Sequence, residues 1–273
     1  MKSFKLKLIP LCLFTIVIFL CSTIVTGQQK DEIKFDKGLA AKIIGEYGRS
    51  PVHSDLLEFQ LMNGSLETPE DGNLFGVTDT EEEIFWTEVK VDEKGWFRSA
   101  SLRGGYLYLS TTLPEEKVII LEAAGNSSLF INGIPRGGDV YGFGWTKHPV
   151  RLKKGRNDFF FRTMRGRVRI KITEPDKAII FTDQDKTLPD LIKGEEDNVW
   201  GAVRIVNSTQ NITGNLVISC EVNNGEKILT DVPVIGQFTS RKVGFRIKPG
   251  LINNSEKAKV FLTLFESSGN TKK

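Results

Sequence analysis

The chain has 273 residues, 40% of them hydrophobic, with 37 Lys and Arg against 34 Asp and Glu. Three of the bases, Lys2, Lys5 and Lys7, lie in the first 27 positions, which hold no acid, so the rest of the chain has no net formal charge. A protein that binds nucleic acid by releasing counterions normally presents a net basic domain. The charge balance therefore argues against a nucleic-acid partner, and the length allows one large or two ordinary domains.

The N-terminal segment has the order of a secretory signal. After the lysines, an apolar run over 8–25 leads to small and β-branched residues that end at Gly27. We expect cleavage after Gly27, with Gln28 as the new terminus of a secreted or periplasmic protein that then has no membrane contact. Two alternatives stay open. The run is long enough to be an uncleaved membrane anchor, and Cys21 could carry a lipid, although two bulky residues precede it.

Few residues beyond this segment suit metal sites or disulfides. Of cysteine and histidine, only Cys220, His53 and His148 remain. One cysteine cannot form an intramolecular disulfide, and the set is too small for a structural zinc site. We expect Cys220 to be a buried strand residue and His148, which precedes Pro149, to be structural. We expect no metal and no cofactor.

Short β-branched and aromatic runs, cut by Gly, Asn, Pro and Asp, dominate the rest of the sequence. This spacing predicts an all-β fold of antiparallel sandwiches. A short helix is expected only over 33–47, where three glycines weaken it. The polar stretch 183–197 is the best linker between two β-domains. The expected strands cover 84–91, 106–110, 118–122, 128–132, 149–152, 158–164, 167–172, 178–182, 199–207, 216–222, 227–233, 241–247 and 257–265.

Two local patterns specify strand geometry further. The apolar run 129–134 is interrupted by Asn132-Gly133, the pair that tolerates the positive φ angles of a tight hairpin turn. Downstream, bases at 165, 167, 169 and 171 alternate with aliphatic residues at 168, 170 and 172. A period of two predicts a half-buried antiparallel strand with its cations on one face.

Charge is segregated along the chain. Residues 147–171 hold ten bases and one acid, and residues 67–93 hold ten acids and one base. Opposed charge of equal size suggests that the two segments lie near each other in the fold, or that each faces a different partner. A sharper hypothesis is that the stripe from Arg165 to Lys171 pairs with the acidic segment. The alternative is two separate solvated faces, screened within about 8 Å, because most surface charges contribute little to stability.

No catalytic constellation stands out in the sequence. A serine hydrolase needs a nucleophile on a tight turn beside a histidine base, and Gly-x-Ser-x-Gly does not occur. Carboxylates are plentiful, but the separation of a glycosidase pair is set by the fold. We therefore expect no catalytic residue and no enzymatic activity.

One loop has the composition of a binding site. Residues 131–145 combine glycines with Arg136, Asp139, Tyr141 and Trp145. Flat rings stack on pyranose faces while Arg and Asp hydrogen-bond hydroxyl groups, so these four residues are the candidate sugar-binding set. The alternative is a long loop that seals the open end of a sandwich. We expect three further aromatic residues to be core anchors of one sheet: Trp86, Trp96 and Tyr106.

Several segments resemble known domains. The run 129–136, Gly138-Asp139-x-Tyr141 and the Lys-Lys-Gly-x-Asn at 153–157 resemble galactose-binding-like jelly rolls. The closer resemblance is to the N-terminal non-catalytic region of secreted prolyl-oligopeptidase-type α/β-hydrolases. It extends over residues 80–265 and is carried by the segments 95–97, 104–106, 121–125, 132–141, 187–191 and 202–207.

This resemblance implies a jelly roll followed by an Ig-like sandwich. The implied division is a signal peptide over 1–27, an N-terminal segment with the short helix over 28–80, the jelly roll over 81–175, a linker with a first strand over 176–197, the Ig-like domain over 198–268 and a polar tail over 269–273. Such hydrolases carry their nucleophile in a C-terminal domain that has no counterpart before Lys273. We expect either a truncated product or a stand-alone relative, and no catalytic residue carries over.

Three functions follow as hypotheses. The first is a secreted accessory protein that docks to a hydrolase domain or guides its substrate, with that domain or a peptide as partner. The second is a stand-alone carbohydrate-binding module with a glycan ligand. The third is a glycan-active enzyme that uses unassigned carboxylates.

Overall fold

The computed structural model describes residues 32–46, 53–139, 141–192, 194, 197–249 and 257–267. Strands hold 53% of these residues and helices 5%, which confirms the predicted all-β antiparallel fold. Within these ranges no helix is both long and apolar enough to cross a membrane. The expected signal segment, with Cys21 and the expected cleavage position, lies outside the described residues.

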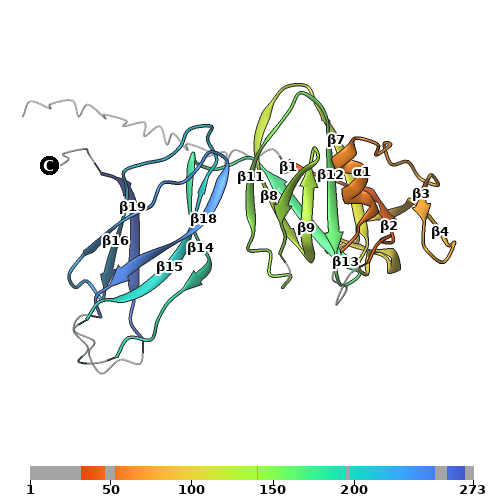
Figure 1. Ribbon diagram of the computed structural model, residues 1–273. Helices are drawn as coiled ribbons and strands as arrows, with labels where there is room; N and C mark the ends of the chain where they lie inside the picture. Colours follow the sequence, from red (N-terminus) through yellow and green to blue (C-terminus); the bar gives the residue numbers. More distant parts are fainter. Residues whose placement is uncertain are drawn as a thin grey trace, which may run out of the picture. The chain divides into compact units, whose positions relative to one another are not determined.

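The first sandwich consists of two antiparallel sheets (Figure 1). The five-stranded sheet contains, in spatial order, β1 (Glu32–Ile33), β13 (Arg167–Thr173), β8 (Lys117–Ala124) and β11 (Lys147–Leu152), with β6 (Trp96–Arg98) also paired to β13. The six-stranded sheet has the order β10 (Ile134–Gly137), β9 (Asn126–Ile131), β12 (Gly155–Thr163), β7 (Tyr106–Leu113), β2 (Lys37–Ala41) and β5 (Thr87–Lys90).

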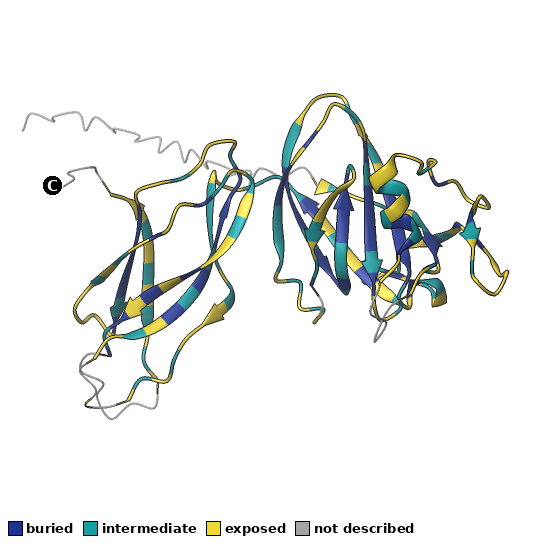
Figure 2. Cartoon of the chain, viewed as in Figure 1, coloured by how far each residue is buried: buried dark blue, intermediate teal, exposed yellow. Residues whose placement is uncertain are grey.

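The main core of this sandwich lies between the two sheets. Strands β8 and β13 contribute Leu121 and Val168 from one side, and β12 contributes Phe159 and Phe161 from the other. All four are fully buried. Figure 2 shows the buried residues on the strands of the two facing sheets. Burial of apolar surface at about 25 cal/mol per Å² is the main force that holds the two layers together.

A second apolar cluster lies on the outer face of the six-stranded sheet. Outward-pointing Tyr106, Tyr108 and Phe160 pack there with Trp86 and Leu57. The elements that supply the cover are the helix α1 (Leu56–Asn63), the strand β3 (Leu74–Val77) and the strand β4 (Glu83–Phe85). A short 3₁₀ turn, η1 (Ala100–Leu102), precedes β7.

The second sandwich has two three-stranded sheets. The first holds β14 (Ile179–Thr187), β15 (Val199–Asn207) and β18 (Thr239–Ile247), and the second holds β17 (Ile228–Asp231), β16 (Leu216–Val222) and β19 (Val260–Glu266). Ile205 and Phe245 meet Ile218 and Cys220 in its core. Cys220 is free and buried, as predicted, and burial raises the pKa of its thiol to about 11.

Several local predictions are confirmed. Strands β15 and β16 have the predicted bounds. Asn132 and Gly133 have φ values of 50° and 80°, and Ile131 pairs with Ile134 across the turn. In β13 the bases at 167, 169 and 171 are exposed, while Val168 and Ile172 are fully buried.

The predicted helix over 33–47 is wrong, because Lys37–Ala41 form β2. This strand lies between β5 and β7 and pairs with both. A Cβ atom on Gly38 would approach Leu109 Cδ2 to 2.4 Å, so glycine permits a close strand contact that a helical pattern cannot reveal. Tertiary pairing overrides local propensity here.

The predicted linker over 183–197 starts too early. Strand β14 continues to Thr187, with an irregular register after Thr182. Asp185 lies in this irregular part with φ 54°, and its carboxylate accepts a hydrogen bond from Lys242 Nζ at 2.9 Å and another from Arg204. Burial alone would raise the pKa of Asp185, but these two hydrogen bonds and the charges behind them outweigh it and lower the pKa. They also tie the polar segment to the sheet.

Candidate functional site

The predicted loop between β10 and β11 carries a stack of aromatic rings. Tyr141, Phe143 and Trp145 alternate with Gly142 and Gly144, whose φ angles are 73° and 72°. The ring centroids of Tyr141 and Phe143 are 6.0 Å apart, and those of Phe143 and Trp145 are 4.4 Å apart. The interplanar angles are 26° and 22°. We call these three residues the aromatic ladder.

The aromatic ladder faces solvent. Tyr141 is 75% exposed, Phe143 57% and Trp145 41%. Stacking the rings on one another hides part of their apolar surface but leaves the outer ring faces and edges in water. Exposed apolar groups that are contiguous, rather than scattered singly, are typical of binding surfaces.

Asp139 holds the loop in shape rather than projecting from it. The residue is 7% exposed, and its carboxylate accepts a hydrogen bond from the backbone N–H of Gly144. Its carbonyl oxygen accepts a second one from the N–H of Gly142 at 3.0 Å. Asp139 therefore holds in place both glycines that separate the rings of the aromatic ladder.

Arg136 lies in the stem of the loop. It belongs to β10, opposite Leu129, and its Nε atom is buried with no hydrogen-bond partner among the described residues. It lies near His148, whose pKa falls to about 4 because of burial and the charge of Arg136. Of the four predicted site residues, the structure thus brings Tyr141 and Trp145 together through Phe143, and places Arg136 and Asp139 in supporting positions.

The aromatic ladder borders the outer face of the five-stranded sheet. Phe143 and Gly144 line a pocket together with Glu122 of β8 and with Arg169 and Lys171 of β13. On the same sheet, Lys147 Nζ lies 2.6 Å from Glu122 Oε1. The predicted loop and the predicted basic strand are therefore neighbours.

Three arginines surround one tryptophan on this face. The guanidinium carbons of Arg167, Arg169 and Arg98 lie 4.7, 5.0 and 5.7 Å from the ring centroid of Trp96. Strand pairing creates this arrangement, because Arg167 is opposite Arg98 and Arg169 is opposite Trp96. We call these four residues the arginine–tryptophan cluster.

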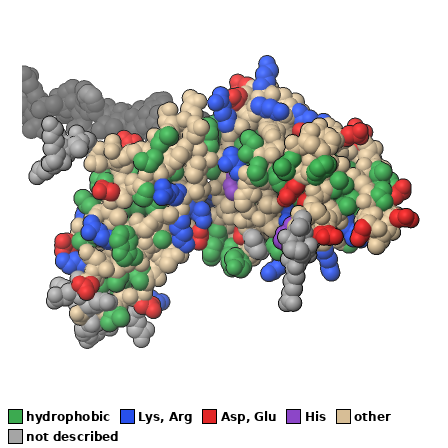
Figure 3. Space-filling model, in the orientation of Figure 1, with side chains coloured by type: hydrophobic (Ala, Val, Ile, Leu, Met, Phe, Trp, Pro, Cys, Tyr) green, Lys and Arg blue, Asp and Glu red, His purple; other side chains and the backbone are tan. Residues whose placement is uncertain are grey.

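Only one of these arginines has an acidic partner among the described residues. Arg98 Nε donates to Asp92 Oδ2 at 2.7 Å, and this bond lowers the pKa of Asp92. The predicted pairing of the basic stripe with the acidic segment is therefore wrong for Arg167 and Arg169, which contact Trp96 instead. Many acids of that segment lie on and beside the β3–β4 hairpin, at the end of the molecule where red atoms gather in Figure 3.

The predicted aromatic anchors divide between the two faces. Trp86 and Tyr106 are 3% and 0% exposed and belong to the cluster beneath α1. Trp96 is only half-buried, beneath its arginines. The prediction that all three anchor one core is therefore wrong for Trp96.

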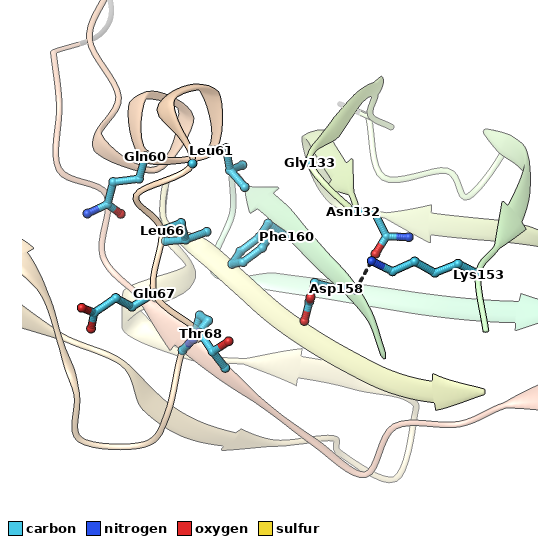
Figure 4. A pocket seen from close by; sticks show the side chains of 12 residues that line it. Gln60, Leu61, Leu66, Glu67, Thr68, Asn132, Gly133, Lys153, Asp158 and Phe160 are labelled. Atoms are coloured by element: carbon cyan, nitrogen blue, oxygen red, sulfur yellow. Dashed lines mark hydrogen bonds between the residues drawn. The ribbon is translucent and has the colours of Figure 1, made fainter. Parts of the chain in front are cut away.

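Sequence reasoning missed a polar pocket of about 280 Å³. Figure 4 shows Gln60 and Glu67 on one side and Lys153, with Asn132 and Asp158, on the other. The Oε1 atom of Gln60 is buried and accepts no hydrogen bond in the described part of the chain. The lining of the pocket thus combines amide, carboxylate and ammonium side chains.

Two turns that carry the resemblance form one wall of this polar pocket. Asn157 is fully buried; its Oδ1 accepts from Asn132 Nδ2 at 2.9 Å and from the N–H of Lys153 at 3.0 Å. Asn132 Oδ1 in turn accepts from the N–H of Asp158 at 3.0 Å. The Asn-Gly and Lys-Lys-Gly-x-Asn motifs therefore form two turns that are joined by asparagine side chains.

The carboxylate of Asp158 is engaged in the wall of the pocket. Its Oδ1 accepts from Tyr108 Oη at 2.6 Å and from Arg156 Nε at 2.8 Å. Burial, together with the bond to Asp158, raises the pKa of Tyr108. Elsewhere in the described chain, no group of three or more His, Cys, Asp or Glu side chains could hold a metal ion.

No family model and no curated protein matches this sequence. Among solved structures, the chain is similar to the Amycolatopsis orientalis exo-chitosanase CsxA (10% identity, TM-score 0.30, 86% of this chain and 29% of that one). It is also similar to a GH2 β-galacturonidase from Eisenbergiella tayi bound to glycerol (12%, 0.35, 87% and 41%). A third similar structure is red sea bream transglutaminase (9%, 0.26, 80% and 34%).

The chain therefore spans less than half the length of each of these proteins. At such TM-scores the similarities assign neither a family nor an activity to it. The resemblance to prolyl-oligopeptidase-type hydrolases stays a prediction.

Proposed function

We propose that this chain is an exported, non-catalytic glycan-binding protein whose sugar-binding surface is the aromatic ladder. The observation that carries the proposal is the solvent-facing stack of Tyr141, Phe143 and Trp145 on a loop fixed by Asp139. The export rests on the N-terminal segment alone.

Physical chemistry favours a sugar as the occupant of this surface. One face of a pyranose ring presents C–H groups that pack against the flat, electron-rich face of an aromatic ring. The outer face of Tyr141 is open for such a contact, since the residue is 75% exposed. Because Asp139 already holds the loop, little conformational entropy is lost on binding, which raises affinity.

The accessory role toward a hydrolase has less support. The residues that carry the resemblance, such as Asn132 and Asn157, bond to one another and join two turns. Their role in the fold explains their presence without a docking partner. The enzymatic alternative also has less support. The carboxylate of Asp158 in the polar pocket already accepts hydrogen bonds from Tyr108 and Arg156.

Binding to a polysaccharide panel tests the proposal. Affinity electrophoresis and calorimetry should detect at least one glycan ligand for the purified protein. If each ring contributes about 0.5–1.5 kcal/mol, the double variant Tyr141→Ala/Trp145→Ala should bind about 5- to 150-fold more weakly. The matched control is Trp200→Ala, which removes a ring that is 60% exposed on β15.

Three results would contradict the proposal. Absence of binding across the panel would remove the function. Loss of binding in Gln60→Leu but not in the ring variants would move the site to the polar pocket. Release of reducing ends from the bound glycan, at a rate abolished by heating the protein, would refute the non-catalytic assignment.

A further inference from the structure

We infer that the glycan bound by this chain is anionic, and that its carboxylate or sulfate groups are bound by Arg167 and Arg169 beside the aromatic ladder. The inference rests on the proposed function and names the chemical class of its ligand. Its basis is the arginine–tryptophan cluster, in which Arg167 and Arg169 have no acidic partner among the residues that the structure describes.

The cluster concentrates positive charge that the described part of the protein neutralises only at Arg98. Arg98, Arg167 and Arg169 all lie within 5.7 Å of one ring centroid. Asp92 pairs with Arg98, and neither Arg167 nor Arg169 has an ion pair among the residues that the structure describes. Guanidinium groups gathered around one ring repel one another, so an anionic ligand that contacts more than one of them gains from each contact.

The tryptophan ring also orders the guanidinium groups. An exposed arginine normally samples many rotamers and loses that freedom when it binds. Stacking on Trp96 holds Arg167 and Arg169 in place before a ligand arrives, through the attraction between a cation and the ring quadrupole. A planar, ordered guanidinium is suited to bidentate hydrogen bonds with a carboxylate or a sulfate.

The cluster is continuous with the aromatic ladder. Of the cluster, Arg169 lines the same pocket as Phe143 and Gly144. Besides Lys171 and the carboxylate of Glu122, which Lys147 neutralises, the carboxylate of Glu32 lines this pocket. Gly95, which precedes Trp96, also lines it, and a Cβ atom there would lie 3.7 Å from Arg169 Cδ. A sugar that stacks on the rings can therefore place an acidic substituent, on the same or the next sugar unit, against Arg169, with Arg167 beside it on Trp96.

A glycan fits this surface better than other polyanions. The exposed rings need a ligand with an apolar face, and an acidic peptide offers charge without a flat ring face. A nucleic acid offers both, but the basic patch is local in a chain whose charges, beyond the first 27 residues, balance. An acidic polysaccharide combines both features in one repeating unit.

The test compares one polymer in two charge states. Polygalacturonate and its fully methyl-esterified form share a backbone, so calorimetric titration with each isolates the effect of the carboxylate. We expect at least 30-fold tighter binding of the acidic form at 20 mM NaCl, with most of that preference lost at 500 mM because salt screens the attraction.

Matched variants locate the effect. Arg167→Gln/Arg169→Gln should lose the preference for the acid and leave binding of the ester unchanged, while Tyr141→Ala/Trp145→Ala should weaken both. The control, Arg241→Gln/Arg246→Gln, removes two exposed arginines from β18 and should change neither. Urea denaturation of each variant should confirm that it folds.

The outcomes separate the two proposals. Equal binding of acid and ester, with the Arg167/Arg169 variant unaffected, would overturn the anionic ligand and leave glycan binding intact. Failure of every glycan in the panel would end both proposals. Arginine-dependent binding of poly-glutamate or single-stranded DNA as tight as that of polygalacturonate would overturn the glycan class.

Discussion

The two outer faces of the first sandwich differ in what their strands present. From the six-stranded sheet, Tyr106, Tyr108 and Phe160 point outward and are covered by α1 and the β3–β4 hairpin. From the five-stranded sheet, Arg167 and Arg169 point outward and are exposed. One face is a second core, and the other is a charged surface.

The difference shows how side-chain type determines which elements a sheet needs. Aromatic residues on an outer face must be covered, because leaving each of them in water forgoes about 1.5–3 kcal/mol. Arginines need no cover, since water solvates them, and Trp96 beneath them is only half-buried. The additional elements of this domain therefore lie over the aromatic face, and the charged face stays free to bind.

The largest expected difference in the free energy of unfolding is between variants of two tryptophans, Trp86 on the covered face and Trp96 on the charged face. Trp86 is 3% exposed and contacts Phe75, with ring centroids 5.1 Å apart. Trp86→Ala should lower the free energy of unfolding by about 3–5 kcal/mol, because it leaves a cavity beneath α1. Urea denaturation followed by circular dichroism measures it.

Trp96→Ala is the control for that prediction. It should cost about 1 kcal/mol or less, since only cation–π contacts and partial burial are lost. Equal losses from the two variants would show that the charged face is as much a core as the covered one, and the distinction between the faces would fail.

The junction between α1 and the sheet should be the next most sensitive point. Asp55 caps the helix by accepting from the N–H of Leu57 at 2.9 Å and of Glu58 at 3.2 Å. Its other carboxylate oxygen accepts from the Tyr106 hydroxyl. Asp55→Ala should therefore lower stability by about 2–3 kcal/mol, more than the loss of a cap alone.

A double-mutant cycle separates the two roles of Asp55. Tyr106→Phe removes the hydroxyl and leaves the cap in place. If the cap and the tyrosine contact are coupled, the double variant should lose less than the two single losses combined. If the two losses of stability simply add, the helix cap and the tyrosine contact of Asp55 are independent of one another.

The sequence was informative wherever short-range patterns decide the structure. The period of two at 167–172 and the Asn132-Gly133 pair depend on neighbours two to four residues away, and both predictions are confirmed. The helix over 33–47 was wrong because Gly38 and Ala40 owe their conformation to strands distant in sequence. Local propensity carries no information about such partners.

The candidate site shows the same limit. Composition identified Tyr141 and Trp145, but the supporting role of Asp139 appears only in its bond to Gly144. The contact of Trp96 with Arg167 depends on the pairing of β6 with β13, which no motif encodes. Nothing in the sequence indicated Gln60, because the feature that distinguishes it is a buried oxygen atom without a hydrogen-bond partner among the described residues. Such a feature exists only in the packed structure.

His148, in the strand that follows the loop of the aromatic ladder, makes the free energy of unfolding depend on pH. Burial and the charge of Arg136 lower its pKa from 6.5 to about 4. Below pH 6.5 the unfolded chain binds a proton that the folded chain does not bind until pH 4, so stability falls as the pH decreases through this window. Between pH 7 and pH 5 this effect should amount to about 1–2 kcal/mol.

Comparison with His148→Gln isolates this contribution. The wild-type protein should lose stability between pH 7 and pH 5 by about 1–2 kcal/mol more than the variant, as measured by urea denaturation at each pH. Parallel pH profiles would show that His148 titrates alike in both states, and that the buried imidazole does not cause the dependence.

The smallest effect on stability is expected from the charged face itself. Arg167→Gln/Arg169→Gln should change the free energy of unfolding by less than about 0.5 kcal/mol at 20 mM and at 500 mM NaCl. Both arginines lie over Trp96 without an acidic partner in the described ranges, so the lost ring contacts are offset by relief of their repulsion with Arg98. A loss above about 1 kcal/mol that disappears at high salt would instead show that they pair with the acidic segment.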